Sequence, residues 1–203
     1  RTGMGRTETG PTVFLMDEAD VSDKIGSVGR PQLLTEARVV DADGQDVTSG
    51  QPGELLIRGP NVTPGYWNRP AATHEAFGPG GWLHSGDVAK VDSDGCFYII
   101  DRCKDMYISG GENVYPAEAE RVLVEHPAVG EVAVVGVPDD KWGEVGKAFI
   151  CLKDDNHQLQ AEDIIDWSRE RLAHYKVPKH FEVVGELPRN SLGKVKKQIL
   201  RQD

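Results

Sequence analysis

The sequence predicts an α+β protein in which a β-rich first half precedes a half of alternating strands and helices. Short β-type runs in the first half, such as 37–40 and 54–58, are each followed by a turn signal, Asp-Gly or Gly-Pro. The runs 88–92 and 96–100 flank residues 93–95, whose glycine can adopt the positive φ that a hairpin turn needs. We therefore expect a hairpin within a unit made mostly of strands.

The pattern changes after the first hundred residues. A helix is expected from Pro116, because proline suits the first helical turn and an apolar stripe of helical spacing follows it. Apolar runs of strand length occupy 132–137 and 147–152, and a further helix is expected near 161–174. This half therefore predicts a small α+β domain.

The charged segment 101–105 separates the two patterns. We therefore expect two domains, residues 1–103 and residues 104–203, each with its own core. The chain opens without an initiator Met and without an apolar element before its first polar motif, which suggests a fragment of a longer protein.

The composition is that of an ordinary globular protein, with 38% hydrophobic and 28% charged residues. A net charge of −10 argues against a general nucleic-acid binder, because such proteins attract phosphates with positive charge. No apolar run approaches the roughly 18 residues that span a bilayer, and the first residues lack the apolar core of a signal peptide. We expect a cytoplasmic protein whose three cysteines are reduced.

Two motifs of the first half carry oxygen ligands. The segment 7–11, Thr-Glu-Thr-Gly-Pro, can hold a hydrated divalent ion and contact a phosphate, although a plain turn uses the same residues. The segment 81–87, Gly-Trp-Leu-His-Ser-Gly-Asp, is expected to form a tight loop. In that loop Asp87 could accept hydrogen bonds from a ribose diol, and a solvated aspartate beside a buried tryptophan is the alternative.

Two further motifs lie in the second half. Gly110 and Gly111 follow a strand signal, and a backbone without Cβ atoms lets a ligand approach closely. Near the end of the chain, Lys194 follows a glycine in an expected loop, from which its ammonium group could neutralise developing phosphoryl charge. A solvated basic tail is the alternative for that segment.

Taken in order, these motifs resemble the adenylate-forming superfamily, with the closest likeness to fatty-acyl and aryl-acyl CoA synthetases. The likeness extends from the first residues to the last. It rests on seven segments: Gly5-Arg6-Thr7-Glu8, Gly53-Glu54-Leu55, Gly65-Tyr66-Trp67, 81–87, 101–105, Gly110-Gly111-Glu112-Asn113-Val114-Tyr115-Pro116 and Pro188-Arg189-Asn190-Ser191-Leu192-Gly193-Lys194.

The resemblance implies an AMP-forming carboxylate–CoA ligase with ATP, Mg²⁺ and coenzyme A as cofactors. A carboxylic acid would attack the α-phosphate of ATP to give an acyl-adenylate, and the thiol of coenzyme A would then displace AMP. It also implies a distorted, barrel-like β-rich end of the large AMP-binding domain, followed by a small mobile lid domain. The fatty or aromatic acid used, its pathway and the oligomeric state are left open.

For the first step, the resemblance assigns roles to residues of both domains. Glu8 would help to hold magnesium, and Met4, Gly5 and Thr7 would lie at the nucleotide. Asp87 and Arg102 would bind the ribose hydroxyls. Lys194 would be the catalytic residue that bridges the carboxylate and the α-phosphate.

For the second step, the resemblance makes Lys104 a hinge about which the lid domain rotates. The Gly110-Gly111 loop would then face the pantetheine arm of coenzyme A. We expect Trp142, Tyr175 and Lys179, with Lys176 nearby, to contact its nucleotide end through an aromatic face and cations. A buried core tryptophan and solvated lysines are the alternative.

One departure from the family limits these expectations. The phosphate-binding loop, and most of the acyl pocket, precede the Thr7-Glu8 motif in the family, and this sequence contains neither. We therefore interpret the chain as the C-terminal part of such a ligase. The alternatives are an adenylation domain that loads a carrier protein, and a binding module that is inactive by itself.

Overall fold

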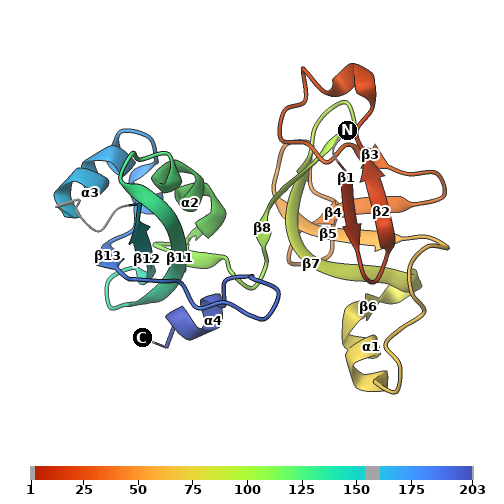
Figure 1. Cartoon of the computed structure of the whole chain (residues 1–203). Coiled ribbons are helices and arrows are strands. Elements are labelled where there is room, and N and C mark those ends of the chain that lie inside the picture. Colours follow the sequence, from red (N-terminus) through yellow and green to blue (C-terminus); the bar gives the residue numbers. More distant parts are fainter. Residues whose placement is uncertain (1–2, 154–160, 203) are drawn as a thin grey trace. The chain divides into compact units, whose positions relative to one another are not determined.

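The computed structural model describes residues 3–153 and 161–202. The chain folds into two compact units, Arg1–Cys103 and Lys104–Asp203 (Figure 1). Both units combine helices with β-sheets, which confirms the α+β class.

The first unit contains two antiparallel sheets. The smaller sheet has the order β1 (Gly3–Arg6), β2 (Gly10–Leu15) and β3 (Arg30–Pro31). The larger sheet has the order β4 (Glu36–Val40), β5 (Gly53–Arg58), β7 (Trp82–Val91) and β6 (Phe77–Gly78), with β8 (Phe97–Arg102) also paired to β7. The helical turns of this unit are η1 (Glu18–Asp20), α1 (Pro70–Ala76) and η2 (Pro79–Gly81). No closed barrel forms among the described strands.

The core of the first unit joins the two sheets. Phe14 of β2 and Phe97 of β8 place their ring centroids 5.0 Å apart, and Leu55 and Ile57 of β5 are fully buried beside them. The core therefore fixes the β1–β2 hairpin against β7 and β8. The expected hairpin around 93–95 is confirmed as the β7–β8 pair.

The second unit is built on a five-stranded sheet. Its strands are β9 (Tyr107–Ser109), β10 (Glu112–Val114), β11 (Val129–Asp139), β12 (Gly143–Leu152) and β13 (His180–Val183), in the order β10-β9-β12-β11 with β13 parallel to β12. Its helical elements are α2 (Pro116–Val124), α3 (Ala161–Arg169), η3 (His174–Lys176) and α4 (Lys197–Leu200).

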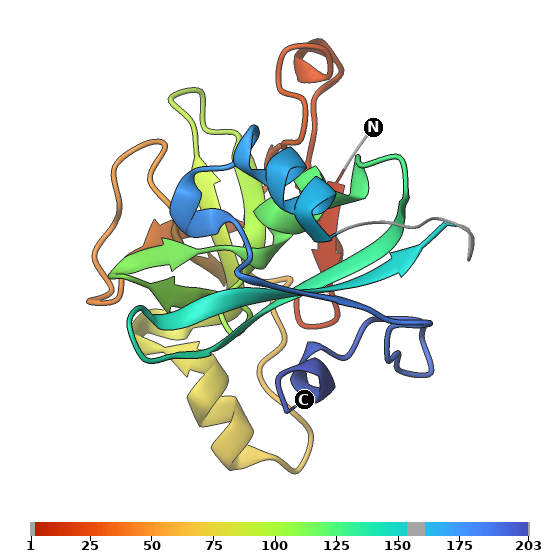
Figure 2. The same ribbon diagram turned by 90° about the vertical axis from the view of Figure 1, so that its left-hand side faces the viewer.

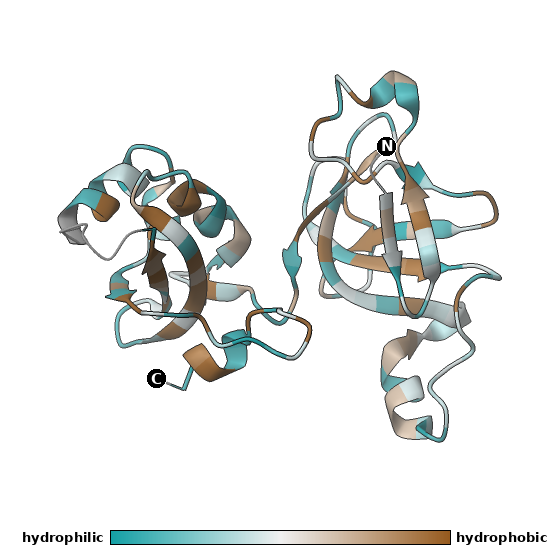
Figure 3. Ribbon diagram, in the orientation of Figure 1, coloured by the Kyte–Doolittle hydropathy of each residue, from teal (hydrophilic) through white to brown (hydrophobic). Residues whose placement is uncertain are grey.

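Strand alternation gives this sheet two covered faces. Val134 of β11 packs toward Leu123 of α2 and Ile164 of α3, whereas Val135 packs toward Leu187 and Leu200 on the opposite face. In Figure 2, α2 and α3 accordingly lie above the strands and α4 lies below them. Brown, hydrophobic stretches run along β11 in Figure 3.

Two sequence predictions for this half need adjustment. The helix from Pro116 is confirmed as α2, but the expected helix at 161–174 ends at Arg169. Residues 170–172 form a turn, Ala173 is extended with φ −60° and ψ 144°, and a separate 3₁₀ turn follows. Within the described residues, no helix is both long and apolar enough to cross a membrane.

Candidate functional site

The first candidate group lies on the β1–β2 hairpin. Gly5 stands where the strands approach most closely, because a Cβ built there would lie 2.0 Å from the carbonyl oxygen of Pro11. Residues 7–9 form the turn, which places Glu8 at the tip of the hairpin and leaves Thr7 exposed. Glycine at position 5 is therefore a steric requirement of the hairpin that carries Glu8.

Met4 and Thr9 border this turn. Met4, which the resemblance assigns to the nucleotide, is half-buried and packs against the core of the first unit. The hydroxyl group of Thr9 is buried and has no hydrogen-bond partner in the described part of the chain. Thr9 is 1% exposed, so this hydroxyl is enclosed in the turn behind Glu8.

Asp87 lies on β7 and not in a tight loop, which corrects our expectation for 81–87. β7 continues through this segment, but its pairing with β5 is interrupted by a bulge between His84 and Val88. Ser85 and Asp87 lie buried within the bulge, whereas His84 is exposed. Asp87 is only 4% exposed. A buried carboxylate needs strong partners, because burial without them is costly.

Two arginines supply those partners. Arg102 lies opposite Asp87 in the β7–β8 register, and its Nε is 2.8 Å from Oδ1 of Asp87. Arg6 of β1 donates a hydrogen bond from Nη1 to Oδ2 of the same carboxylate. The structure therefore brings together Asp87 and Arg102, which the sequence analysis had paired, and adds Arg6.

Arg6 also links Asp87 to Glu8. Its Nε is 3.7 Å from Oε2 of Glu8, and the hydroxyl of Tyr66 donates to Oε1 of Glu8 at 3.0 Å. Burial, and then the hydrogen bond to Glu8, raise the pKa of Tyr66. Arg6 had no role of its own in the sequence analysis, and its positive charge directly after Gly5 in the motif 5–8 is the signal that could have identified it.

The carboxylate of Glu54 supports this group from β5. Its Oε1 accepts the backbone amide of Gly86 at 3.1 Å, and its Oε2 is 2.9 Å from Nδ1 of His84. Gly86 has φ +66° and directly precedes Asp87. Glu54 thus fixes the backbone next to the buried carboxylate, a role that the motif Gly53-Glu54-Leu55 did not reveal.

The chemistry around Glu8 fits magnesium bound together with a nucleotide. Mg²⁺ commonly takes one or two protein carboxylates and completes its shell with water and substrate phosphates. Glu8 offers one such carboxylate at the tip of the hairpin, next to the exposed Thr7. The described residues contain no cluster of three or more His, Cys, Asp or Glu that would form an all-protein metal site.

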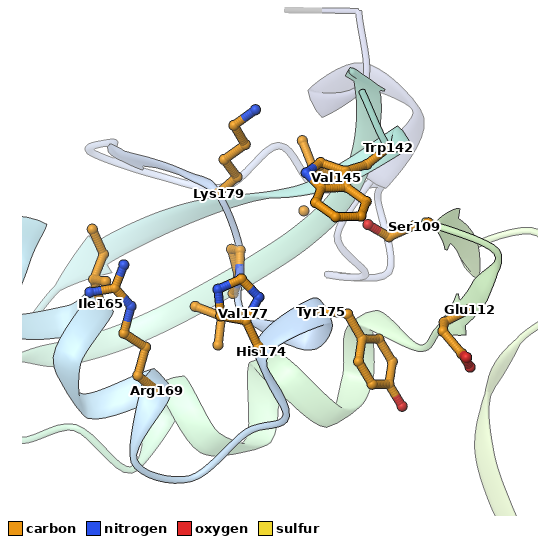
Figure 4. Close-up of a pocket in the computed structure, with 13 residues that line it drawn as sticks. Ser109, Glu112, Trp142, Val145, Ile165, Arg169, His174, Tyr175, Val177 and Lys179 are labelled. Atoms are coloured by element: carbon orange, nitrogen blue, oxygen red, sulfur yellow. The ribbon is translucent and has the colours of Figure 1, made fainter. Parts of the chain in front are cut away.

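The second candidate group is a cavity of about 440 Å³ in the second unit (Figure 4). Four parts of the fold contribute to its walls: the β9–β10 turn, the β11–β12 turn with β12, α3, and the segment 174–179. The expected contacts Gly110, Trp142, Tyr175 and Lys179 all line it, together with Arg169 and His174. Gly111 is not among the lining residues.

Gly110 holds Trp142 at the cavity wall. Its φ is +59°, its amide donates to the carbonyl oxygen of Trp142 at 2.9 Å, and a Cβ there would lie 2.9 Å from the indole ring. Trp142 is 43% exposed, so it is not the core tryptophan of the alternative interpretation. The indole therefore lines the cavity while remaining partly exposed, and the ammonium group of Lys141 lies 4.7 Å from its ring centroid.

The lysines of this region are paired. Lys179 forms an ion pair with Asp139, and this hydrogen bond lowers the pKa of Asp139. Lys176 donates to both carboxylate oxygens of Glu118 at 2.8 Å and does not line the cavity. Of the two, only Lys179 lines the cavity, and its ammonium group is engaged by Asp139.

Lys194 is exposed on a turn formed by residues 190–194. The side chain of Asn190 accepts the amides of Leu192 and Lys194 at 3.0 and 2.9 Å. Arg189 donates to the carbonyl oxygen of Gly193 at 2.7 Å and pairs with Glu131 of β11 at 2.6 Å. The turn is thus held on the sheet while the ammonium group of Lys194 stays free in the described structure.

Lys104 is the first residue of the second unit. It is exposed, and it follows Cys103, whose thiol is half-buried; burial raises the pKa of that thiol to about 11. Cys96 and Cys151 are buried, and all three cysteines are free. Burial also raises the pKa of the Cys96 and Cys151 thiols.

Comparison with known proteins identifies the class to which this fold and these groups belong. Residues 1–67 match the AMP-binding enzyme family, and residues 118–194 match the C-terminal domain of AMP-binding enzymes. The chain belongs to the adenylate-forming, AMP-binding enzyme superfamily.

Within this superfamily, the chain is most informatively compared with relatives named as CoA synthases or ligases. The chain is 48% identical over 200 residues to a feruloyl-CoA synthase from Amycolatopsis sp, covering 98% of this chain and 40% of the relative. It is 46% identical over 201 residues to a long-chain-fatty-acid–CoA ligase from Escherichia coli O157:H7, covering 99% of this chain and 35% of the relative. The chain thus spans less than half the length of these curated relatives.

A solved structure gives the same result for the fold. The o-succinylbenzoate CoA synthetase of Bacillus subtilis, in complex with its acyl-adenylate intermediate, matches with a TM-score of 0.90 and 40% identity. The match covers 97% of this chain and 40% of that protein. Another structure of that synthetase contains ATP and a magnesium ion.

Proposed function

We propose that this chain forms the C-terminal part of an AMP-forming carboxylate–CoA ligase. The observation that carries the proposal is the buried carboxylate of Asp87, held by Arg102 and Arg6 beside Glu8. Family membership and relatives named as CoA ligases or synthases support it.

In the first step, a carboxylic acid attacks the α-phosphorus of ATP and pyrophosphate leaves. Asp87 accepts hydrogen bonds from the ribose hydroxyls, and Arg102 orients that carboxylate and contributes a ribose contact. Glu8 would hold magnesium, which screens the repulsion between the attacking carboxylate and the triphosphate. Lys194 supplies the positive charge that stabilises the developing α-phosphoryl oxygens.

In the second step, the thiol of coenzyme A attacks the acyl carbonyl and AMP leaves. We assign the nucleotide end of coenzyme A to the cavity of the second unit, where the exposed indole of Trp142 and the phenol ring of Tyr175 offer stacking surfaces. Lys179 adds a cation for its phosphates. The Gly110-Gly111 turn contacts the pantetheine arm. Rotation of the second unit about Lys104 converts the enzyme from the arrangement used in the first step to that used in the second.

The substrate class within this proposal is a fatty or aromatic acid. A relative named feruloyl-CoA synthase supports an aromatic acid, and one named long-chain-fatty-acid–CoA ligase supports a fatty acid. The two are similar in sequence identity to this chain, at 48% and 46%. The cytoplasmic location expected from the sequence, where ATP and coenzyme A are abundant, is also part of the proposal.

The direct test is carboxylate-dependent release of pyrophosphate from ATP and magnesium. A panel of fatty and aromatic acids is assayed with this chain and with the complete product of its reading frame. Activity in the complete product supports the ligase. Thioester formation on a phosphopantetheine-bearing carrier protein, and not on coenzyme A, would favour the carrier-loading alternative. No activity from a folded complete product would favour the binding module.

A further inference from the structure

Hydrogen bonds fix the backbone on both sides of one peptide group at the domain boundary. The amide of Cys103 donates to the carbonyl oxygen of Gly86 at 2.9 Å, which ties it to β7 of the first unit. On the other side, Arg201 donates to the carbonyl oxygens of Lys104 and Asp105, each at 3.0 Å. The peptide group that joins Cys103 to Lys104 lies between these anchors.

Arg201 is itself attached firmly to the second unit. It directly follows α4, whose Leu200 is 4% exposed and packs against the sheet. The ammonium group of Lys197, at the start of α4, is 2.7 Å from the carboxylate of Glu120 on α2. The guanidinium of Arg201 is a rigid planar fork, so its two terminal nitrogens can bind two successive carbonyl groups at once.

We propose that Arg201 is a positioning residue that confines the hinge to the dihedral angles of Cys103 and Lys104. The inference rests on the proposed function, in which the second unit rotates about Lys104. Peptide groups are planar, so holding the carbonyls of Lys104 and Asp105 also holds the amides of Asp105 and Met106. Rotation is then left to the bonds between the two anchors.

This arrangement joins the hinge to the catalytic lysine. Arg201 lies seven residues after Lys194. The Asn190 cap and the Arg189–Glu131 pair hold the turn that carries Lys194 on the sheet, and Leu200, next to Arg201, packs on the same sheet. The hinge anchor and the lysine therefore move as one body. A hinge with few rotatable bonds directs that body along a defined path, whereas a longer flexible tether would not.

The test measures ¹⁵N relaxation of backbone amides in this chain without any substrate. In the unaltered chain we expect order parameters of about 0.85 for Asp105 and Met106, the value of rigid backbone. Arg201→Ala should lower both below about 0.6, the range of flexible backbone, and leave β11 and β12 unchanged. Arg201→Lys keeps the charge but loses the fork, so it should give intermediate values.

Arg171→Ala is the matched control, because Arg171 also donates to a backbone carbonyl of the second unit, that of Trp167, away from the hinge. It should leave Asp105 and Met106 unchanged. Unchanged order parameters of Asp105 and Met106 in Arg201→Ala would overturn the proposal. Lowered order parameters throughout the second unit would also overturn it, because they would indicate a general structural role for Arg201. Because no substrate is used, this result is independent of whether the ligase assay succeeds.

Discussion

At the scale of single residues, the candidate site combines one buried carboxylate with several exposed or half-buried cations. Asp87 is nearly inaccessible, and its charge is balanced within the unit by Arg6 and Arg102. Lys194 differs because it is exposed and unpaired in the described structure. A lysine held by its backbone but free at its ammonium group suits a role in which it meets a charge supplied by substrate.

We therefore expect Lys194→Ala to lower the rate of adenylate formation in the complete ligase by on the order of 100- to 1,000-fold, as for loss of one electrostatic stabiliser. Thioester formation from supplied acyl-adenylate should be largely retained. Pyrophosphate release and thioester formation are measured separately, with Lys196→Ala, another exposed lysine, as the control. Equal loss of both half-reactions would remove Lys194 from this role.

Replacement of Arg6 tests the balance of charge around Asp87. Arg6→Met should lower the free energy of unfolding of the first unit by about 1.5–3 kcal/mol, because a buried carboxylate loses one charged hydrogen bond. Arg38→Met is the control, since its partner Asp46 is largely exposed, and it should cost less than about 1 kcal/mol. Urea unfolding followed at β7 amides measures both, and similar losses would contradict this account.

At the scale of elements, the loop between β2 and β3 is fastened to the β7–β8 turn. Lys24 of the loop contacts Asp92 at 2.8 Å and also contacts Asp94. Asp92 additionally accepts the backbone amides of Asp94 and Cys96. The hydrogen bond from Lys24 is the main cause that lowers the pKa of Asp92 to about 2.

This pairing predicts a pH dependence for the first unit. A carboxylate whose folded-state pKa is depressed stabilises the fold above its ordinary pKa, here 3.8, and that stability is lost as the pH falls through about 2. Asp92→Asn should therefore flatten the decline in unfolding free energy between these pH values. Urea titrations at several pH values measure it, with Asp43→Asn in another turn as the control. An unchanged slope in Asp92→Asn would refute the assignment.

At the scale of the whole molecule, the two units each carry one part of the proposed chemistry. The first unit contains the residues proposed for ribose and magnesium, and the second contains the lysine turn and the cavity proposed for coenzyme A. Each unit has its own core, so neither depends on the other for its internal packing. A substitution at the hinge should therefore alter the switch from the first half-reaction to the second, and leave the structure of the Asp87 group and of the cavity unchanged.

Lys104→Pro tests this division. Proline fixes φ at position 104 and restricts Cys103, so rotation between the anchors is limited. We expect the second half-reaction of the complete ligase to slow more than the first. Lys104→Ala, which leaves the backbone free, should retain both rates. An unchanged second half-reaction in Lys104→Pro would show that the hinge lies elsewhere.

The sequence by itself determined the α+β class, the β7–β8 hairpin, α2 and the family. It could do so because turn residues, apolar periodicity and motif order are local properties of the chain. The roles given to Asp87, Arg102 and Lys194 came from the same motif order, and they remain proposals.

The tertiary structure decided what depends on residues distant in sequence. Strand pairing made residues 82–87 part of β7, and Asp87 is buried where it lies opposite Arg102 of β8. Only the packing of β1 against β7 could bring Arg6 to Asp87 across 81 positions of sequence. The same holds for Arg201 and Lys104, because the hydrogen bonds of a guanidinium depend on where the fold places its partners.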